Sequence, residues 1–138
     1  MPNTTVTQYT VPLPNKPGQL AELTKLLADK GINLTGISTE TFGDIGFVRF
    51  AVQEKEAEVK GLLEAKGLKP TWTKVFQIEL PNQPGQLHQL AAKLGQQGVN
   101  IVNLYGSACG NAPSTLYVAV DQFEKAQPIL EKELAAAR

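Results

Sequence analysis

The chain has 138 residues, enough for one or two small domains with a hydrophobic core. Thirteen basic and thirteen acidic residues balance without any basic cluster, which argues against nucleic acid as a partner. No apolar stretch approaches 18 residues and the first ten residues are polar. We therefore expect no membrane association, no signal peptide and a cytoplasmic location.

Residues that commonly carry chemistry are scarce. Cys109 is the only cysteine and His88 the only histidine, so we expect no disulfide, no metal site and no nucleophilic thiol. The sequence contains no paired carboxylates, no Ser/His/Asp set and no phosphate-binding loop. It therefore predicts a protein that is not an enzyme, has no catalytic residues and needs no cofactor.

The first half of the chain alternates between strand and helix patterns. A strand is predicted over residues 4–13, which are rich in β-branched side chains. Residues 17–30 carry leucines at helical spacing, and Gly31 is predicted to end that helix. Residues 32–42 and 45–52 predict a β-hairpin, and residues 54–66 a second amphipathic helix.

The second half follows the same order. Residues 68–80 are long enough to be the last strand of one unit and the first of the next. A helix is predicted over residues 84–97, then a hairpin from 99–107 and 115–120, then a helix from residue 121. Pro128 leaves two alternatives for that helix: a kink, or a short turn before a helix that begins at Pro128.

This order predicts an α+β protein of two ferredoxin-like βαββαβ units, at residues 1–72 and 73–138. Each unit is expected to have an antiparallel sheet with both helices on one face. The chain ends where the second unit's last strand is expected, which leaves about seven strands.

One phrase occurs twice at an offset of 67, as LPNKPGQL over residues 13–20 and LPNQPGQL over residues 80–87. In each copy it joins a strand to a helix. Proline suits the first helical position, and the asparagine two residues earlier suits a turn in which its side chain bonds nearby N–H groups. Glycine is a poor helix former, so we interpret it as allowing another group to approach the backbone.

A helix that starts in this way has unpaired N–H groups and a positive dipole end, which suit a carboxylate. The alternative is an ordinary capped helix start, and a short motif by itself does not exclude it. Repetition of the phrase in the same context favours the binding interpretation.

The repeated phrase, followed by Leu23, Leu27 and residues 31–34 (GINL), resembles the ACT domain, a small regulatory module that binds amino acids. The second copy repeats the resemblance with Leu90, Leu94 and residues 98–101 (GVNI). The resemblance covers nearly the whole chain and implies a stand-alone, tandem ACT protein. It implies regulation by a free amino acid bound where two ACT units meet.

Carried over by position, the resemblance implicates twelve ligand-binding residues. The turns contribute Asn15, Pro17, Gly18, Gln19, Leu20, Asn82, Pro84, Gly85, Gln86 and Leu87. The second strand of each copy contributes Asn33 and Asn100, each of which follows a helix-ending glycine and has capping as its alternative role. His88 is expected to be solvated.

The resemblance also implies a homodimer, and an enzyme of amino-acid metabolism as a partner. Two alternatives remain open at this point. The chain could be an interaction or oligomerisation module, or a regulatory subunit without a ligand of its own. It could also be an enzyme on the same scaffold, because a fold does not determine a function.

Overall fold

The computed structural model describes residues 3–136, in two compact units. The N-terminal unit comprises residues 6–73. The C-terminal unit comprises residues 74–136 together with residues 3–5. Within residues 3–136, no helix has the length and apolar character that crossing a bilayer requires.

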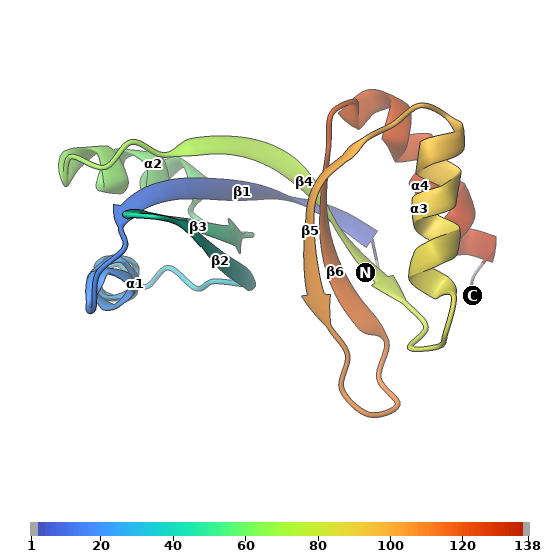
Figure 1. Cartoon of the computed structure of the whole chain (residues 1–138), viewed down its shortest axis with the longest axis horizontal. Helices are drawn as coiled ribbons and strands as arrows, with labels where there is room; N and C mark the ends of the chain where they lie inside the picture. The colour runs from blue at the N-terminus through green and yellow to red at the C-terminus, as the bar shows by residue number, and fades with distance from the viewer. Residues whose placement is uncertain (1–2, 137–138) are drawn as a thin grey trace. The chain divides into compact units, whose positions relative to one another are not determined.

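The N-terminal unit is built from three antiparallel strands, two helices and the start of a fourth strand (Figure 1). Its sheet has the order β2-β3-β1, and the elements are β1 (Asn3–Pro14), α1 (Gln19–Asp29), β2 (Gly36–Phe42), β3 (Ile45–Val52) and α2 (Glu56–Ala65). The predicted hairpin is present, with its turn at residues 43–44. Its first strand begins at Gly36 rather than residue 32.

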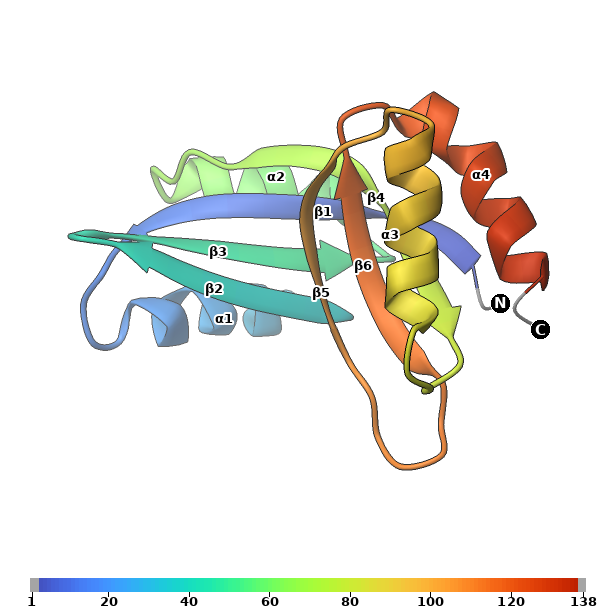
Figure 2. The ribbon, with the colours of Figure 1, turned by 45° about the vertical axis from the view of Figure 1, so that its right-hand side comes forward.

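The C-terminal unit repeats this arrangement with the strand order β4-β6-β5. Its elements are β4 (Thr71–Leu80), α3 (Gln86–Gln96), β5 (Ile101–Ser107), β6 (Ser114–Val120) and α4 (Phe123–Ala136). In Figure 2 α3 and α4 lie on the same side of this unit's strands. The loop between β5 and β6 has six residues, 108–113, against two in the first copy.

Each unit includes a short strand segment from the other half of the sequence. Residues 71–73, at the start of β4, belong to the N-terminal unit, and residues 3–5, at the start of β1, belong to the C-terminal unit. The described chain has six strands rather than about seven, in the order β2-β3-β1-β4-β6-β5, because residues 71–80 form one continuous strand. The α+β prediction of two ferredoxin-like units, the second without a last strand of its own, is confirmed.

Each unit has its own hydrophobic core between its sheet and its two helices. In the N-terminal unit Tyr9, Val11 and Phe50 pack against Leu27 of α1 and Leu63 of α2. The core of the C-terminal unit is made by β4, β6 and both helices, with buried residues Phe76, Ile78, Leu80, Leu90, Leu94, Val99, Leu116, Val118, Ala126 and Leu130. The helices therefore cover one face of each sheet, as predicted.

The predicted helix ends are confirmed. Gly31 has φ 66° and Gly98 φ 75°, a conformation that glycine adopts without strain. In the first copy the Ile32 N–H donates to the Leu27 carbonyl at 3.0 Å, and in the second copy the Val99 N–H donates to the Leu94 carbonyl at 2.9 Å. This six-to-one bond is the mark of the Schellman motif.

The structure decides against one of the two alternatives for Pro128. The helix α4 begins at Phe123 and contains Pro128, so a helix that begins at Pro128 is wrong. Pro128 is the sixth residue of α4, beyond the first turn, so the bond that an N–H there would make to the Glu124 carbonyl is absent. The kink stays a prediction.

Tyr9 makes the stability of the N-terminal unit depend on pH in the alkaline range. Its hydroxyl donates to the Glu56 carbonyl, and burial together with the Glu56 carboxylate raises the pKa of Tyr9 above its ordinary value. The unfolded chain therefore loses this proton first, at about pH 10, so stability falls as pH rises further. We expect Tyr9→Phe to lower stability near neutral pH but to flatten its fall above about pH 10. Urea unfolding across this range measures the difference, and parallel curves would contradict it.

Candidate functional site

The repeated turn has the same geometry in both copies. Gly18 has φ 87° and ψ −12°, and Gly85 has φ 89° and ψ −11°. These are the angles of the third residue of a type II β-turn, and proline favours the position before it. Gln19 N–H donates to the Lys16 carbonyl at 3.4 Å and Gln86 N–H to the Gln83 carbonyl at 3.4 Å, which closes each turn.

This geometry corrects the prediction that proline occupies the first helical position. α1 begins at Gln19 and α3 at Gln86, and the glycines are the N-cap residues. Nothing lies within 4 Å of a Cβ added at Gly18 or Gly85. The physical reason for glycine is therefore its positive φ, and not a close approach by another part of the described chain.

The asparagine side chains also bond differently from the prediction. Asn15 Nδ2 donates to the Gly43 carbonyl at 3.0 Å, and Asn82 Nδ2 donates to the Gly110 carbonyl at 3.0 Å. We expected these side chains to bond N–H groups of their own turn. Each instead ties its turn to the tip of the following hairpin, 28 residues further along the chain.

In the C-terminal unit a cleft of about 230 Å³ lies beside this turn. One wall is the turn and the first turn of α3, and the other is the end of the β5–β6 hairpin. It is lined by Leu80, Pro81, Asn82, Gln83, Gln86, Leu87, Gly106, Ser107, Ala108, Ser114 and Leu116. This volume is below the range of sites for drug-sized ligands, so the cleft suits a small molecule.

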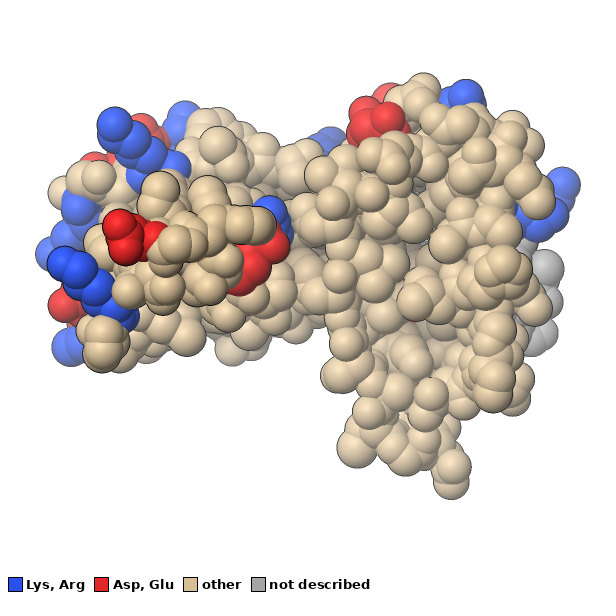
Figure 3. All heavy atoms as spheres, viewed as in Figure 1, with Lys and Arg blue, Asp and Glu red and all other residues tan. Residues whose placement is uncertain are grey.

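The walls of this cleft carry amide and hydroxyl groups but no charge. Lys93 is the only Lys, Arg, Asp or Glu between Leu80 and Val120. In Figure 3 the β5–β6 hairpin, in the lower part of the view, shows no charged side chain. The cleft can therefore form neutral hydrogen bonds through Asn82, Gln83, Gln86, Ser107 and Ser114, but no ion pair.

The start of α3 adds backbone donors. Its first intrahelical bond joins Gln89 N–H to the Gly85 carbonyl at 3.0 Å, and no side chain caps the helix. The earlier N–H groups of a helix have no acceptor within it and carry the positive dipole end. α1 and α2 also lack a side-chain cap, so this feature alone does not mark a site. The adjoining cleft of α3 is uncharged, whereas the cleft along α1 is lined by charged residues such as Glu22 and Lys25.

The other predicted residues fall into two groups. Leu20 and Leu87 are 43% and 45% exposed, Pro17 and Pro84 are exposed in the turns, and His88 is exposed on α3. Asn33 and Asn100 are exposed beyond the other ends of α1 and α3, about 16 Å from the turns by the rise of an 11-residue helix. Within one unit the structure does not bring these asparagines to the turn.

The hairpin wall was missed by the sequence interpretation. Gly106, Ser107 and Ser114 line the cleft, and none was predicted. Gly106 offered a signal, because glycine inside a strand often marks a close approach of two backbones. A Cβ at Gly106 would lie 2.2 Å from the Thr115 carbonyl oxygen. The serines offered no comparable signal.

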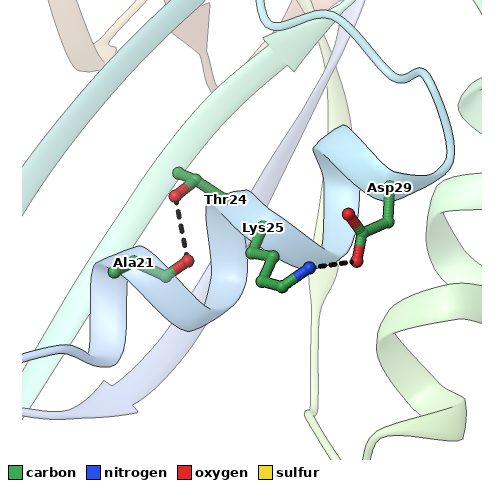
Figure 4. A network of polar contacts seen from close by, with 4 residues as sticks. All are labelled: Ala21, Thr24, Lys25 and Asp29. Carbon is green, nitrogen blue, oxygen red and sulfur yellow. Dashed lines mark hydrogen bonds and ion pairs between the residues drawn. The ribbon is translucent and has the colours of Figure 1, made fainter.

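A larger cleft, of about 420 Å³, runs along α1 in the N-terminal unit. Gln19 is its only predicted site residue, and Leu13, Leu23, Leu26 and Leu68 form its apolar part. Figure 4 shows Lys25 reaching Asp29 one helical turn on, at 2.8 Å. These two side chains are 74% and 60% exposed, so they form a solvated surface pair. We therefore place the candidate site at the turn.

Among residues 3–136 no group of three or more His, Cys, Asp or Glu side chains is arranged to hold a metal ion. His88 and Cys109 are both exposed.

The paired units with matching strand-to-helix turns define a tandem regulatory module of the ACT type. The ACT domain pair family matches residues 4–136, and the chain belongs to that family. Among curated proteins, none matches the sequence.

Solved structures share the fold over nearly the whole chain. A protein from Bacteroides thetaiotaomicron is 26% identical with a TM-score of 0.85, over 96% of this chain and 91% of that one. The regulatory subunit of aspartate kinase from Thermus thermophilus is 18% identical with a TM-score of 0.72, over 98% and 95%. Its counterpart from Thermus flavus is 19% identical with a TM-score of 0.71, over 99% and 97%. At these last two identities the likeness shows the fold alone.

Proposed function

We propose that this protein is a non-catalytic, cytoplasmic regulator that binds a small free amino acid in the cleft beside the turn at residues 81–87. The observation that supports this most is the joining of an uncapped helix start to a small, uncharged cleft. The ligand carboxylate accepts hydrogen bonds from backbone N–H groups at the start of α3. Its ammonium group donates to amide and hydroxyl oxygens of the walls.

The chemistry of the walls favours an amino acid with a small, uncharged side chain. A charged side chain would lose its hydration in the cleft without gaining an ion pair. The lining offers apolar contact from Leu80 and Leu116 and hydroxyl groups from Ser107 and Ser114. The better candidate ligands are therefore glycine, serine, threonine and alanine. Lysine, arginine and the acidic amino acids are poorer candidates.

We further propose that the N-terminal turn, with Asn15, Pro17, Gly18, Gln19 and Leu20, forms a second, related site. Neither Asn33 nor Asn100 reaches the turn of its own unit. In a homodimer, one of these asparagines would instead reach the turn of the partner protomer. The regulated partner would be an enzyme of amino-acid metabolism. Regulation requires that the ligand bind one assembly state more tightly than another.

A charge placed at the start of α3 tests the site. We expect Gln86→Glu to weaken amino-acid binding by about tenfold or more, because a carboxylate there repels that of the ligand. Folding should be retained, since an acidic residue in the first helical turn is stabilising by roughly 0.3–1 kcal/mol. Gln86 is a better test position than Gly85, whose φ of 89° strains any side chain. Calorimetric titration measures the affinity.

The matched control is Gln19→Glu, the same change in the first copy. It should weaken binding at the proposed N-terminal site and leave the affinity of the C-terminal cleft unchanged, so each titration is fitted to two sites. Equal affinities for Gln86→Glu and the wild type would place the site elsewhere.

The alternative proposal is an interaction module, or a regulatory subunit without its own ligand, whose turns only start helices. The type II turn and the hydrogen bond from Asn82 to the hairpin loop favour this alternative, because both also stabilise the fold without a ligand. Thermal-shift and calorimetric screening of the twenty amino acids on ligand-free protein separates the two. No response by either method would favour the interaction module, and light scattering in the same samples determines the oligomeric state.

A further inference from the structure

We propose that the hydrogen bond from Asn82 to Gly110 is a latch through which occupancy of the cleft controls the order of the loop at residues 108–113. This inference rests on the proposed function, because it assigns a regulatory output to the same cleft. The latch is the bond from Asn82 Nδ2 to the Gly110 carbonyl, 3.0 Å long.

The latch joins the two walls of the cleft. Asn82 belongs to the wall made by the turn, and Gly110 lies in the loop that continues from the other wall. That second wall includes Ser107 and Ala108 just before the loop, and Ser114 just after it. Backbone ladders hold most of the second wall, because Leu80 pairs with Ser114 and Ser107 pairs with Thr115. Ala108 lies beyond these pairs, so its distance from the turn depends on whether the latch is formed.

The first copy shows what a more firmly held hairpin looks like. Asn15 makes the same side-chain bond to Gly43, but its N–H also donates to the Asp44 carbonyl at 2.8 Å. The β2–β3 ladder continues to the pair of Phe42 with Ile45, directly beside the two-residue turn. The first hairpin is thus fixed by its backbone, whether or not the Asn15 side-chain bond is present.

The second copy has fewer such restraints among its described residues. Its ladder ends at the pair of Ser107 with Thr115, and six residues lie between the strands. Within that loop Ala112 N–H donates to the Cys109 carbonyl at 3.1 Å. Asn82 supplies the tie from the loop to the turn, and this tie is exposed to water. An exposed hydrogen bond of this kind opens readily.

Linkage then couples the loop to the ligand. A small molecule that touches both Ala108 and the turn binds the latched state more tightly than the open state, because only the latched state holds Ala108 at a fixed distance from the turn. Binding therefore shifts the population toward the latched loop. By reciprocity, loss of the latch weakens binding by the same factor. Ligand binding in the small cleft therefore makes the exposed loop at residues 108–113 more ordered.

The test compares hydrogen exchange of the loop in the wild type, Asn82→Ala and the matched variant Asn15→Ala. Mass spectrometry follows the peptide over residues 105–116, and a nitroxide on Cys109, the only cysteine, reports loop motion separately. In ligand-free protein we expect Asn82→Ala to speed loop exchange about fivefold and Asn15→Ala to leave it unchanged. Saturating glycine, serine or threonine should slow loop exchange in the wild type and bind Asn82→Ala about fivefold more weakly.

The outcomes separate the latch from the proposed function. If Asn82→Ala weakens binding while its ligand-free loop exchanges as in the wild type, Asn82 is only a ligand contact and the latch is overturned. Binding to the wild type without slower loop exchange also overturns the latch but leaves the proposed function standing. If no amino acid binds the wild type, the proposed function fails and the ligand coupling fails with it.

Discussion

Gly106→Ala is expected to lower the free energy of unfolding of the C-terminal unit by about 3 kcal/mol or more. The added Cβ would lie 2.2 Å from the Thr115 carbonyl oxygen and 2.6 Å from Leu116 Cδ2. The first of these atoms belongs to the backbone of β6, so relief requires the two strands to separate. Because Gly106 also lines the cleft, amino-acid binding should be lost together with stability.

The matched control for this prediction is Gly95→Ala. Gly95 lies inside α3, and a Cβ added there meets nothing within 4 Å. Alanine is the better helix former, so this variant should gain stability, by less than the roughly 1 kcal/mol of a helix-interior site because Gly95 lies in the last turn of α3. Urea unfolding of both variants checks the opposite signs. A Gly106→Ala protein as stable as the wild type would show that β5 does not approach β6 as closely as described.

Leu94→Ala is expected to cost the C-terminal unit about 2–5 kcal/mol, and Leu27→Ala should cost the N-terminal unit a similar amount. The two leucines are 0% and 1% exposed, at corresponding positions of separate cores. Each substitution leaves a cavity that lowers the stability of its own core. Native-state hydrogen exchange, read peptide by peptide, should show the loss in one unit at a time.

The starts of β1 and β4 test which unit each strand segment belongs to in this experiment. Residues 3–5 belong to the C-terminal unit and residues 71–73 to the N-terminal unit. Leu94→Ala should therefore speed exchange near residue 4, and Leu27→Ala near residue 72. The boundary predicted between residues 72 and 73 stays a prediction until this test. Equal acceleration throughout residues 3–136 in both variants would mean that the chain unfolds as one unit.

Local patterns predicted most of the elements because local physics decides them. Leucine spacing placed α1 and α3, and the glycines at residues 31 and 98 ended them as expected. The helix starts were predicted less well. The pair of proline and glycine forms a type II turn, in which glycine's positive φ outweighs the suitability of proline for a first helical position.

The candidate site was predicted on one side only. The turn could be found because its phrase occurs twice, whereas the hairpin wall lies some 20 to 30 residues further along with no repeated motif. The role of Asn15 and Asn82 was also out of reach. An asparagine amide can donate or accept, and only the position of the hairpin tip selects the glycine carbonyl as its partner.

The periodicities of strands and helices predicted two ferredoxin-like units, and the resemblance carried by the repeated phrase identified them as ACT domains, the family to which the chain belongs. Only the tertiary structure decided which strand segments each unit includes and what faces the turn. Residues 3–5, from the other end of the sequence, belong to the C-terminal unit. Strand pairing and cleft formation depend on contacts between distant residues. Local sequence patterns do not record those contacts.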